Sequence, residues 1–421
     1  MEVLSQLRFK EFTAGWKIVT INQLIDDGLL IPPMDGNHGE IHPKSSDYVP
    51  QGIPFIMAND VIDGSIDFEN CKKIPLELAK SLRKGFSIPD DVLLTHKGSV
   101  GNTAIVPDHS DFEFVMLTPQ VTYYRVAEPN ALSNRYILQY FNSGTFQKFL
   151  KIAADSGTRP YIGITQQRKS PFQLCEFDEQ KKIAEFLGAV DEKIRLLQSR
   201  HEQLTLYKKG VMQKIFAQDI RFKADDGSDF PDWETVKMKE VFYEVKDKVG
   251  NKNIETYSIS SKTGFRSQKE KFGKDISGEQ NKNYIVLQTN QFSYNKGNSK
   301  TFKYGCVYLS KFDFPIAVPN VFISFALKDE KNVEEFFSQK FADHHLDWGL
   351  RRIISSSARM NGLLNLSKVD FFDLTVPLAH PDEQQKIADF LSAIDDKIDA
   401  VSAQIENMQS FKKGLLQQMF V

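Results

Sequence analysis

The sequence predicts an α+β protein with two similar domains, each made largely of strands with a few helices, joined by two long helices. Residues 178–216 and 382–420 are identical at 18 of 39 positions, without a gap, at a constant offset of 204 residues. Each copy follows its own globular segment, and short motifs of one segment recur in the other. Internal repeats of this kind indicate the organisation of a chain before local motifs do.

The repeat divides the chain into four segments. We expect a first domain over residues 1–177, a central long helix over 178–218, a second domain over 219–381 and a C-terminal long helix over 382–421. Domains of roughly 170 residues are of ordinary size. Helical runs inside the domains are expected at 131–154 and 334–355.

Both long helices carry a narrow apolar stripe. Spacings of four and three residues keep one face toward a partner helix, as in a coiled coil. We expect the seam to contain Ile183, Leu187, Val190, Ile194 and Leu197, and in the second copy Ile387, Leu391, Ile394, Ile398 and Val401. The stripe misses one step at Lys208 and at Lys412. The alternative, that each helix covers only the core of its own domain, predicts a wider apolar face.

The duplication extends into the globular segments. Arg8 and Trp16 recur as Arg221 and Trp233, each pair standing shortly before strand-like alternation. We match the apolar run 91–95 to 306–310, and residues 155–159 to 355–359. On this match the second copy lacks the aspartate at position 91 and the glycine-containing loop 98–102 that follows it. Because the other loops differ, one fold with two different surfaces is expected.

Composition restricts the compartment. The three cysteines Cys71, Cys175 and Cys306 are far apart and odd in number, which argues against a disulfide framework and suits a reducing cytoplasm. No stretch approaches the roughly 18 apolar residues of a membrane span, and residues 1–12 contain no signal-peptide run. We therefore expect a cytoplasmic protein without a membrane anchor.

The net charge of −2 hides basic regions. Residues 257–311 contain ten basic and three acidic side chains, interleaved with aromatic residues. Basic residues on loops can neutralise phosphates and reach base edges, so we expect contact with DNA. The candidate residues are Lys97, Ser99, Arg159, Arg168, Lys169, Lys262, Arg266, Lys269, Lys296, Lys300, Arg351 and Arg359. For Arg159 and Arg359 a structural ion pair is the alternative role.

Taken together, these patterns resemble the specificity subunit of type I restriction–modification systems. The resemblance rests on the Asp-Glu-Gln starts at 178–180 and 382–384, on Lys-Lys-Gly at 208–210 and 412–414, on Trp16 and Trp233, and on the segments 52–64 and 91–107. It implies that two target-recognition domains each read one half of a split DNA sequence. It also implies that the repeated helices form an antiparallel coiled coil that relates the domains by a pseudo-twofold axis.

The same resemblance implies the partners. Double-stranded DNA would be the ligand, and the helices would dock two modification (methyltransferase) subunits. Restriction subunits, which are ATP-driven translocases and nucleases, would complete the complex. S-adenosylmethionine, ATP and Mg²⁺ would then bind those partners, and no cofactor would bind this chain.

The residues themselves argue against chemistry in this chain. The sequence has no Asn-Pro-Pro-aromatic tetrapeptide of a methyltransferase, and the Gly-Ser-Val-Gly run at 98–101 is expected to turn into another strand, where a phosphate-binding loop would lead into a helix. His38 and His42 have the i, i+4 spacing of a zinc site, but nearby glycines and prolines disfavour the helix it needs. We expect no metal site. Two alternatives remain open at this stage: an unrecognised enzyme, and a coiled-coil adaptor with protein-binding arms.

Overall fold

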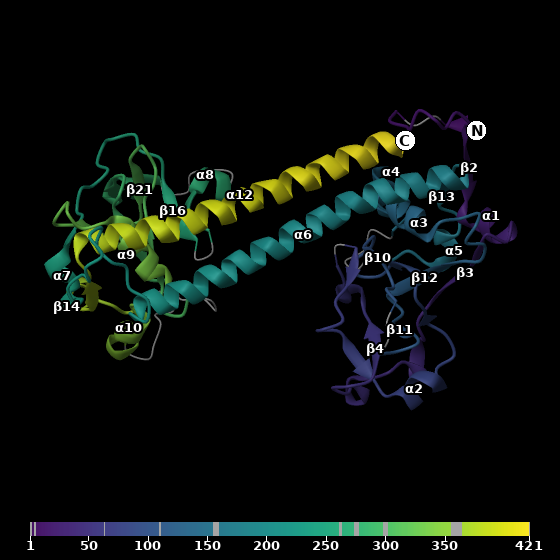
Figure 1. The fold of residues 1–421 in the computed structure, drawn as a ribbon, viewed down its shortest axis with the longest axis horizontal. Coiled ribbons are helices and arrows are strands. Elements are labelled where there is room, and N and C mark those ends of the chain that lie inside the picture. The colour runs from purple at the N-terminus through teal and green to yellow at the C-terminus, as the bar shows by residue number, and fades with distance from the viewer. Residues whose placement is uncertain are drawn as a thin grey trace. The chain divides into compact units, whose positions relative to one another are not determined.

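The computed structural model describes residues 2–3, 6–62, 64–108, 111–154, 160–260, 263–272, 278–297, 302–354 and 364–420. The chain forms two compact units. The first unit contains residues 1–199 and 402–421, and the second contains residues 200–401. Each unit therefore combines one globular domain with a part of both long helices, which Figure 1 shows as uninterrupted ribbons.

The two long helices have the expected places in the chain. Helix α6 spans Phe177–Phe216 and α12 spans Pro381–Met419, with 40 and 39 residues. Each begins with two acidic residues in its first turn, where negative charge stabilises the helix dipole. At 1.5 Å per residue each helix is about 60 Å long.

The helices pair in antiparallel fashion within each unit. In the first unit, Ile183 and Leu187 near the start of α6 share a hydrophobic core with Leu415 and Met419 near the end of α12. In the second unit the roles are exchanged: Met212 and Ile215 near the end of α6 share a core with Ile387 and Leu391 near the start of α12. The start of one helix thus packs beside the end of the other in both units.

The first unit contains three main sheets. Strands β1 (Glu2–Val3), β2 (Trp16–Thr20) and β13 (Pro171–Leu174) form the one next to α6. The second sheet has the order β10-β9-β12-β3, with bounds Thr103–Ile105, Val92–Thr95, Val121–Val126 and Leu30–Asp35. The third has the order β7-β4-β11-β8, with bounds Lys72–Ile74, Ile53–Ile56, Val115–Leu117 and Phe86–Ser87. A short ladder joins β5 (Val61–Ile62) to β6 (Ser65–Ile66).

Short helices connect these strands. They are α1 (Ile21–Asp26), α2 (Leu76–Ser81), α3 (Asn134–Phe141), α4 (Gly144–Ala153), α5 (Ile164–Gln167) and the 3-10 turns η1 (Gly39–Ile41), η2 (Ser45–Asp47) and η3 (Ala58–Asp60). The expected helical run 131–154 is therefore two helices. The break falls at Asn142 and Ser143, because the Ser143 side chain accepts a hydrogen bond from Phe146 N (3.2 Å) and caps α4.

The second unit repeats part of this plan. Strands β14 (Glu234–Lys237) and β23 (Thr375–Leu378) pair, and a four-stranded sheet has the order β15-β22-β19-β20, with bounds Phe242–Glu244, Ile323–Leu327, Phe292–Asn295 and Cys306–Leu309. Two further antiparallel ladders join β16 (Tyr257–Ser260) to β17 (Gly264–Ser267) and β18 (Ile285–Leu287) to β21 (Ile316–Val318). The helices are α7 (Met238–Val241), α8 (Gln268–Phe272), α9 (Glu334–Ala342), α10 (Asp347–Ile353), α11 (Lys368–Phe372) and η4 (Gly278–Asn283).

The sheet order corrects one expected match between the copies. Strand β19 lies between β20 and β22 as β9 lies between β10 and β12, so residues 306–310 correspond to the second strand of the hairpin and not to 91–95. The turns agree: Asp90 N donates to Val106 O (2.9 Å) and Asn290 N donates to Ser310 O (2.8 Å). Asp90 and Asn290 also share positive φ angles of 70° and 60°. Both strands of a hairpin are short and apolar, so the pattern alone could not tell them apart.

The core of the first unit lies where α3, α4 and α6 meet the sheets. Trp16, Tyr124, Tyr136, Tyr140 and Phe172 are almost completely buried there. The Phe420 ring joins them from the end of α12, with its centroid 5.6 Å from those of Tyr136 and Tyr140. Burying a large apolar side chain contributes roughly 1.5–3 kcal/mol, so residues near position 420 stabilise the domain that begins near position 6.

Two glycines of the first unit differ in the space around them. A Cβ at Gly36 would lie 1.8 Å from Leu117 O, whereas a Cβ at Gly188, inside α6, would meet nothing within 4 Å. We expect Gly36→Ala to destabilise the protein by at least ~1–3 kcal/mol through overpacking. Gly188→Ala should stabilise it by about 1 kcal/mol through helix propensity. Thermal unfolding of both variants checks this, and shifts of the same sign would contradict it.

Candidate functional site

The start of α6 is fixed to the first domain by a buried carboxylate. Glu179 is fully buried and accepts hydrogen bonds from Arg8 Nε and Nη2, both at 2.7 Å. Trp16 Nε1 donates to the same side chain at 2.9 Å. The hydrogen bond to Glu179 raises the pKa of Arg8. Burial of an ion is costly unless it is paired and hydrogen-bonded, and here every partner comes from the segment before β2 or from its first residue.

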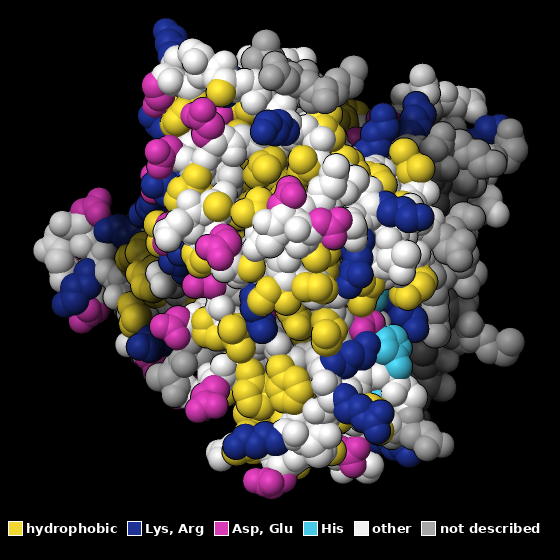
Figure 2. Space-filling view, turned by 90° about the vertical axis from the view of Figure 1, so that its right-hand side faces the viewer, with side chains coloured by type: hydrophobic (Ala, Val, Ile, Leu, Met, Phe, Trp, Pro, Cys, Tyr) yellow, Lys and Arg dark blue, Asp and Glu magenta, His cyan; other side chains and the backbone are white. Residues whose placement is uncertain are grey.

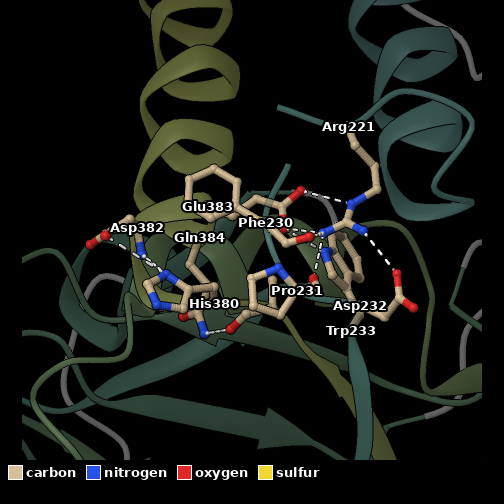
Figure 3. Close-up of polar contacts among 10 residues, drawn as sticks. Arg221, Phe230, Pro231, Asp232, Trp233, His380, Asp382, Glu383 and Gln384 are labelled. Atoms are coloured by element: carbon tan, nitrogen blue, oxygen red, sulfur yellow. Dashed lines mark hydrogen bonds and ion pairs between the residues drawn. The ribbon is translucent and has the colours of Figure 1, made fainter. Parts of the chain in front are cut away.

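The second unit repeats this joint at the start of α12. Glu383 is fully buried and accepts from Arg221 Nε and Nη2 at 3.1 and 2.8 Å, and from Trp233 Nε1 at 2.8 Å (Figure 3). Arg221 also donates to Pro231 O (2.6 Å) and pairs with Asp232 (3.3 Å). The paired arginines and tryptophans that recur in the sequence therefore bind the recurring glutamates.

The next residue of each helix completes the joint. Gln180 donates to Cys175 O (2.9 Å) and accepts from Ser133 N (2.9 Å). Gln384 donates to Ala379 O (2.8 Å) and accepts from Val333 N (2.9 Å). Both glutamines are fully buried. The Asp-Glu-Gln motif is thus a docking element between each long helix and its own domain.

A second contact joins the two helices where the apolar stripe is interrupted. In the first unit Lys412 of α12 pairs with Asp191 of α6 at 2.5 Å, and Gln139 of α3 donates to the same carboxylate at 2.8 Å. In the second unit Lys208 pairs with Asp395 at 2.6 Å, and Gln339 of α9 donates to it at 2.8 Å. The missed steps of the heptad pattern are therefore ion pairs that connect α6, α12 and a domain helix.

The seam residues lie where the helices meet the domains. Nine of the ten expected seam residues are buried, and Ile398 is half-buried. The buried ones are Ile183, Leu187, Val190, Ile194, Leu197, Ile387, Leu391, Ile394 and Val401. Ile183, Leu187, Val190 and Ile194 pack into the core of the first domain as well as against α12. The stripe therefore serves both the domain core and the neighbouring helix, which a sequence period alone does not distinguish.

The first unit presents several of the candidate DNA-contact residues. Lys97 and Ser99 are exposed in the loop after β9, and Lys97 Nζ lies 5.9 Å from the centre of the Tyr161 ring. Two backbone hydrogen bonds, Gly98 N to Pro160 O and Ile162 N to His96 O, both 3.0 Å, hold these two loops together. Lys169 is exposed and Arg168 half-buried at the end of α5, which directly follows the loop that contains Tyr161. Arg159 lies outside the described residues.

The candidate DNA-contact residues of the second unit lie on several different elements. Arg266 and Lys269 are exposed on β17 and α8, and Arg351 is exposed on α10. Lys296 is half-buried after β19, with its ammonium 3.5 Å from Leu366 O. Lys262, Lys300 and Arg359 lie outside the part of the chain that the structure describes.

One cluster in the first unit is absent from the sequence-based candidates. Asp35, the last residue of β3, is almost buried and accepts from His38 Nε2 at 2.7 Å and from Lys84. His96 Nε2 lies 3.9 Å from the same carboxylate, and burial lowers the pKa of His96 to about 4. The sequence showed His38 only as part of a possible metal spacing. Lys84 and His96, the other residues around Asp35, lie 46 and 58 positions after His38, so no local signal marks the cluster.

The described residues contain neither a cluster able to hold a metal ion nor a helix able to span a membrane. No three His, Cys, Asp or Glu side chains in them are grouped so that they could hold a metal ion. His42 Nδ1 faces Asn37 O at 3.2 Å, and its neighbour His38 pairs with Asp35. None of the described helices is long and apolar enough to cross a membrane.

Comparison with known proteins identifies the family. A family model described as "Type I restriction modification DNA specificity domain" matches residues 15–206 and 231–408, which include most of both globular domains and of both long helices. The chain belongs to this family. It is a type I restriction–modification specificity subunit with two DNA specificity domains, and it is a non-catalytic component of such a system. The adaptor with protein-binding arms is thereby set aside.

Individual relatives agree with the family. A protein of Methanocaldococcus jannaschii assigned as the MjaX specificity subunit of a type I restriction enzyme is 24% identical over 386 residues, covering 87% of this chain and 85% of the relative. The type I restriction enzyme MjaVIII specificity subunit of the same organism is 24% identical over 302 residues, covering 64% and 66% of the two chains.

Solved structures share the fold. The S subunit of a type I restriction-modification system from M. genitalium has a TM-score of 0.58 and 14% identity, and the match covers 100% of this chain and 99% of the other. A chain from a study of complex assembly and conformational transition of the type I R-M system has a TM-score of 0.52 and 14% identity, with coverages of 96% and 97%. The α+β architecture with long helices is therefore that of known S subunits.

The buried Arg8–Glu179–Trp16 joint should contribute more to stability than an exposed ion pair on the same helix. Glu179→Ala leaves Arg8 and Trp16 without their shared partner, and we expect a loss of about 3 kcal/mol in the free energy of unfolding. Glu192 pairs with Arg195 at 2.6 Å on the same helix, but both side chains are more than half exposed (53% and 66%). Glu192→Ala should therefore cost far less stability than Glu179→Ala. Urea unfolding of the two variants checks the difference, and equal losses would refute it.

Proposed function

We propose that each specificity domain reads one half of a split, asymmetric DNA target, while the paired helices set the spacer and dock two methyltransferase subunits. The observation that supports this most strongly is the duplicated framework: β10-β9-β12-β3 and β20-β19-β22-β15 have the same order, and both domains are fixed to their helices by the same Arg–Glu–Trp joint.

The surfaces added to this framework differ between the domains. Between β3 and β9 the first domain inserts most of a four-stranded sheet, β7-β4-β11-β8. Between β15 and β19 the second domain inserts the β16–β17 ladder, α8, η4 and β18. A shared scaffold with different insertions is what two domains need if they bind different base sequences. The target would then be asymmetric.

The length of the helices supports a role in setting the DNA spacer between the half-sites. About 60 Å of continuous helix corresponds to about 18 base pairs at 3.4 Å per pair. The Lys208–Asp395 and Lys412–Asp191 pairs fix the helical register inside the two units. A domain docked rigidly to such a helix would meet DNA at a defined distance along the axis, so an unread spacer of fixed length is expected.

Two equivalent aromatic side chains support docking of two partners. Tyr207 of α6 and Phe411 of α12 occupy matching positions of the repeat and are 55% and 52% exposed. A large aromatic side chain on the surface is a common anchor in protein interfaces. One such residue in each unit fits two copies of the same partner.

The cofactors follow from the family resemblance. S-adenosylmethionine would bind the methyltransferase subunits, and ATP and Mg²⁺ the restriction subunits. The specificity subunit would contribute sequence reading and would direct adenine methylation only after assembly. Methylation by this chain in isolation would contradict the proposal.

Native mass spectrometry of the co-expressed complex tests the stoichiometry. We expect two methyltransferase subunits per specificity subunit, and one after either Tyr207→Ala or Phe411→Ala, because each substitution removes one anchor. Leu206→Ala, beside Tyr207 and 61% exposed but opposite Ser410 in the other copy, is the matched control. A stable complex with a single methyltransferase before mutation would refute the two-partner assembly.

The spacer role predicts the effect of an insertion. Four residues inserted after Leu197 lengthen α6 by about 6 Å and disturb the register set by the ion pairs. We expect the accepted spacer to change, or specific binding to be lost, with no change in the preferred bases. A four-residue insertion after Gly227, in an exposed turn, should change neither. Selection from a library with variable spacer checks this, and altered base preference with an unchanged spacer would refute it.

A further inference from the structure

The loop after β3 in the first unit holds one histidine in a fixed orientation. His38 follows β3 by three residues and its side chain is 52% exposed, whereas that of its partner Asp35 is 5% exposed. We propose that His38 reads a base edge in the half-site of the first specificity domain, accepting a hydrogen bond through Nδ1 from the exocyclic amino group of an adenine or cytosine. This rests on the proposed function, in which the domain binds DNA.

The loop is rigid enough for such a role. The buried Asn37 donates to Lys84 O (2.6 Å) and accepts from Arg83 N (3.1 Å), which ties the loop to the segment before β8. Gly36 lies so close to Leu117 O that no side chain would fit. A reader of base edges has to be held in place before DNA arrives, and these contacts hold the backbone at Gly36 and Asn37, between Asp35 and His38.

The carboxylate of Asp35 determines which nitrogen of His38 carries a proton. An ionised carboxylate only accepts hydrogen bonds, so Nε2, at 2.7 Å from Asp35 Oδ2, is the donor. The hydrogen bonds from Lys84 and His38 lower the pKa of Asp35 despite its burial, which keeps the carboxylate ionised. In the neutral imidazole Nδ1 is then an acceptor. Adenine N6 and cytosine N4 are the donors that the major groove offers.

The surrounding charges favour a base over a phosphate. Lys84 is already paired with Asp35, so the cluster adds little net positive charge, and a phosphate at His38 would approach a carboxylate of like sign. Phosphate contacts also need no fixed tautomer. A purely structural pair is disfavoured because Lys84 by itself already neutralises Asp35.

The cluster adjoins the loops with candidate phosphate contacts. His96 lies 3.9 Å from Asp35 and its ring centroid is 5.8 Å from that of Tyr161, over which Lys97 is placed. His38 is therefore linked to Lys97 through a chain of contacts inside one unit. Figure 2 shows Lys, Arg and His side chains near one another on one face. Lys97 would position the backbone of DNA while His38 reads a base.

The described part of the second unit has no counterpart at the corresponding place. There β15 ends at Glu244, which pairs with Lys246 (3.3 Å) and with Lys368 (2.5 Å). The residue that corresponds to His96 is Lys296, because β19 corresponds to β9. An effect of His38 should therefore be confined to one half-site.

The experiment uses the assembled complex with its methyltransferase subunits and a DNA library randomised in both half-sites. His38→Phe keeps the ring shape but removes both nitrogens. We expect discrimination at one base pair of the first half-site to fall about tenfold, with the other positions unchanged. Asp35→Asn removes the carboxylate that fixes the tautomer of His38, and it should lower the base discrimination at the same base pair. His344→Phe is the control, because His344 also pairs with an aspartate three residues away (Asp347, 3.2 Å) but lies in the second unit.

The possible results distinguish base reading by His38 from other roles. Unchanged base preference in His38→Phe, with normal binding, overturns the inference. Uniformly weaker binding with a shallower salt dependence would make His38 a phosphate contact and would also overturn it. If the unmodified complex shows no sequence-specific DNA binding, the proposed function itself fails. Because His38 is exposed, the variant should retain its unfolding temperature, and His38→Asn provides a second variant with a smaller side chain.

Discussion

Glu179 and Glu383 are fully buried carboxylates, and an unpaired ion in a protein interior costs several kcal/mol. Each is therefore stable only if an arginine and a tryptophan reach it from the segment that begins its domain. This requirement fixes where the first segment of each domain lies. It also fixes the orientation of each long helix relative to its own domain. The sheets, the inserted loops and the exposed residues of the domain are placed relative to the helix by this joint.

The ion pairs in the middle of the helices add a second constraint. A lysine at a seam position weakens a purely apolar coil, but Lys208 and Lys412 each meet an aspartate that also accepts from a domain glutamine. Only one register satisfies all three groups. Polar residues at seam positions are known to specify register at some cost in stability, and here they also connect the coil to the domains.

Much of the architecture could be predicted because its signals are periodic or repeated. The helix repeat and the recurring Arg8–Trp16 and Arg221–Trp233 pairs indicated two similar domains and two long helices. They did not indicate that these arginines and tryptophans bind the glutamates at the helix starts. The hairpin match failed because residues 92–95 and 306–309 are equally apolar and only the hydrogen-bond ladder separates their places. The Asp35–His38–Lys84 cluster was missed because Lys84 meets the end of β3 in space from a segment 46 residues after His38, without a shared sequence pattern.

The antiparallel arrangement has a consequence for how the protein is made. Phe420 and Met419 close the core around Trp16 and Tyr136, so the first unit contains residues from both extremes of the described chain. On the ribosome, the first domain emerges early but lacks part of its apolar core until residue 420 has left the exit tunnel. The second unit, which is contiguous, can fold before then. Nascent chains would therefore expose the aromatic surface around Tyr140 during synthesis, and a chain that ends before α12 would keep that surface exposed to chaperones and proteases.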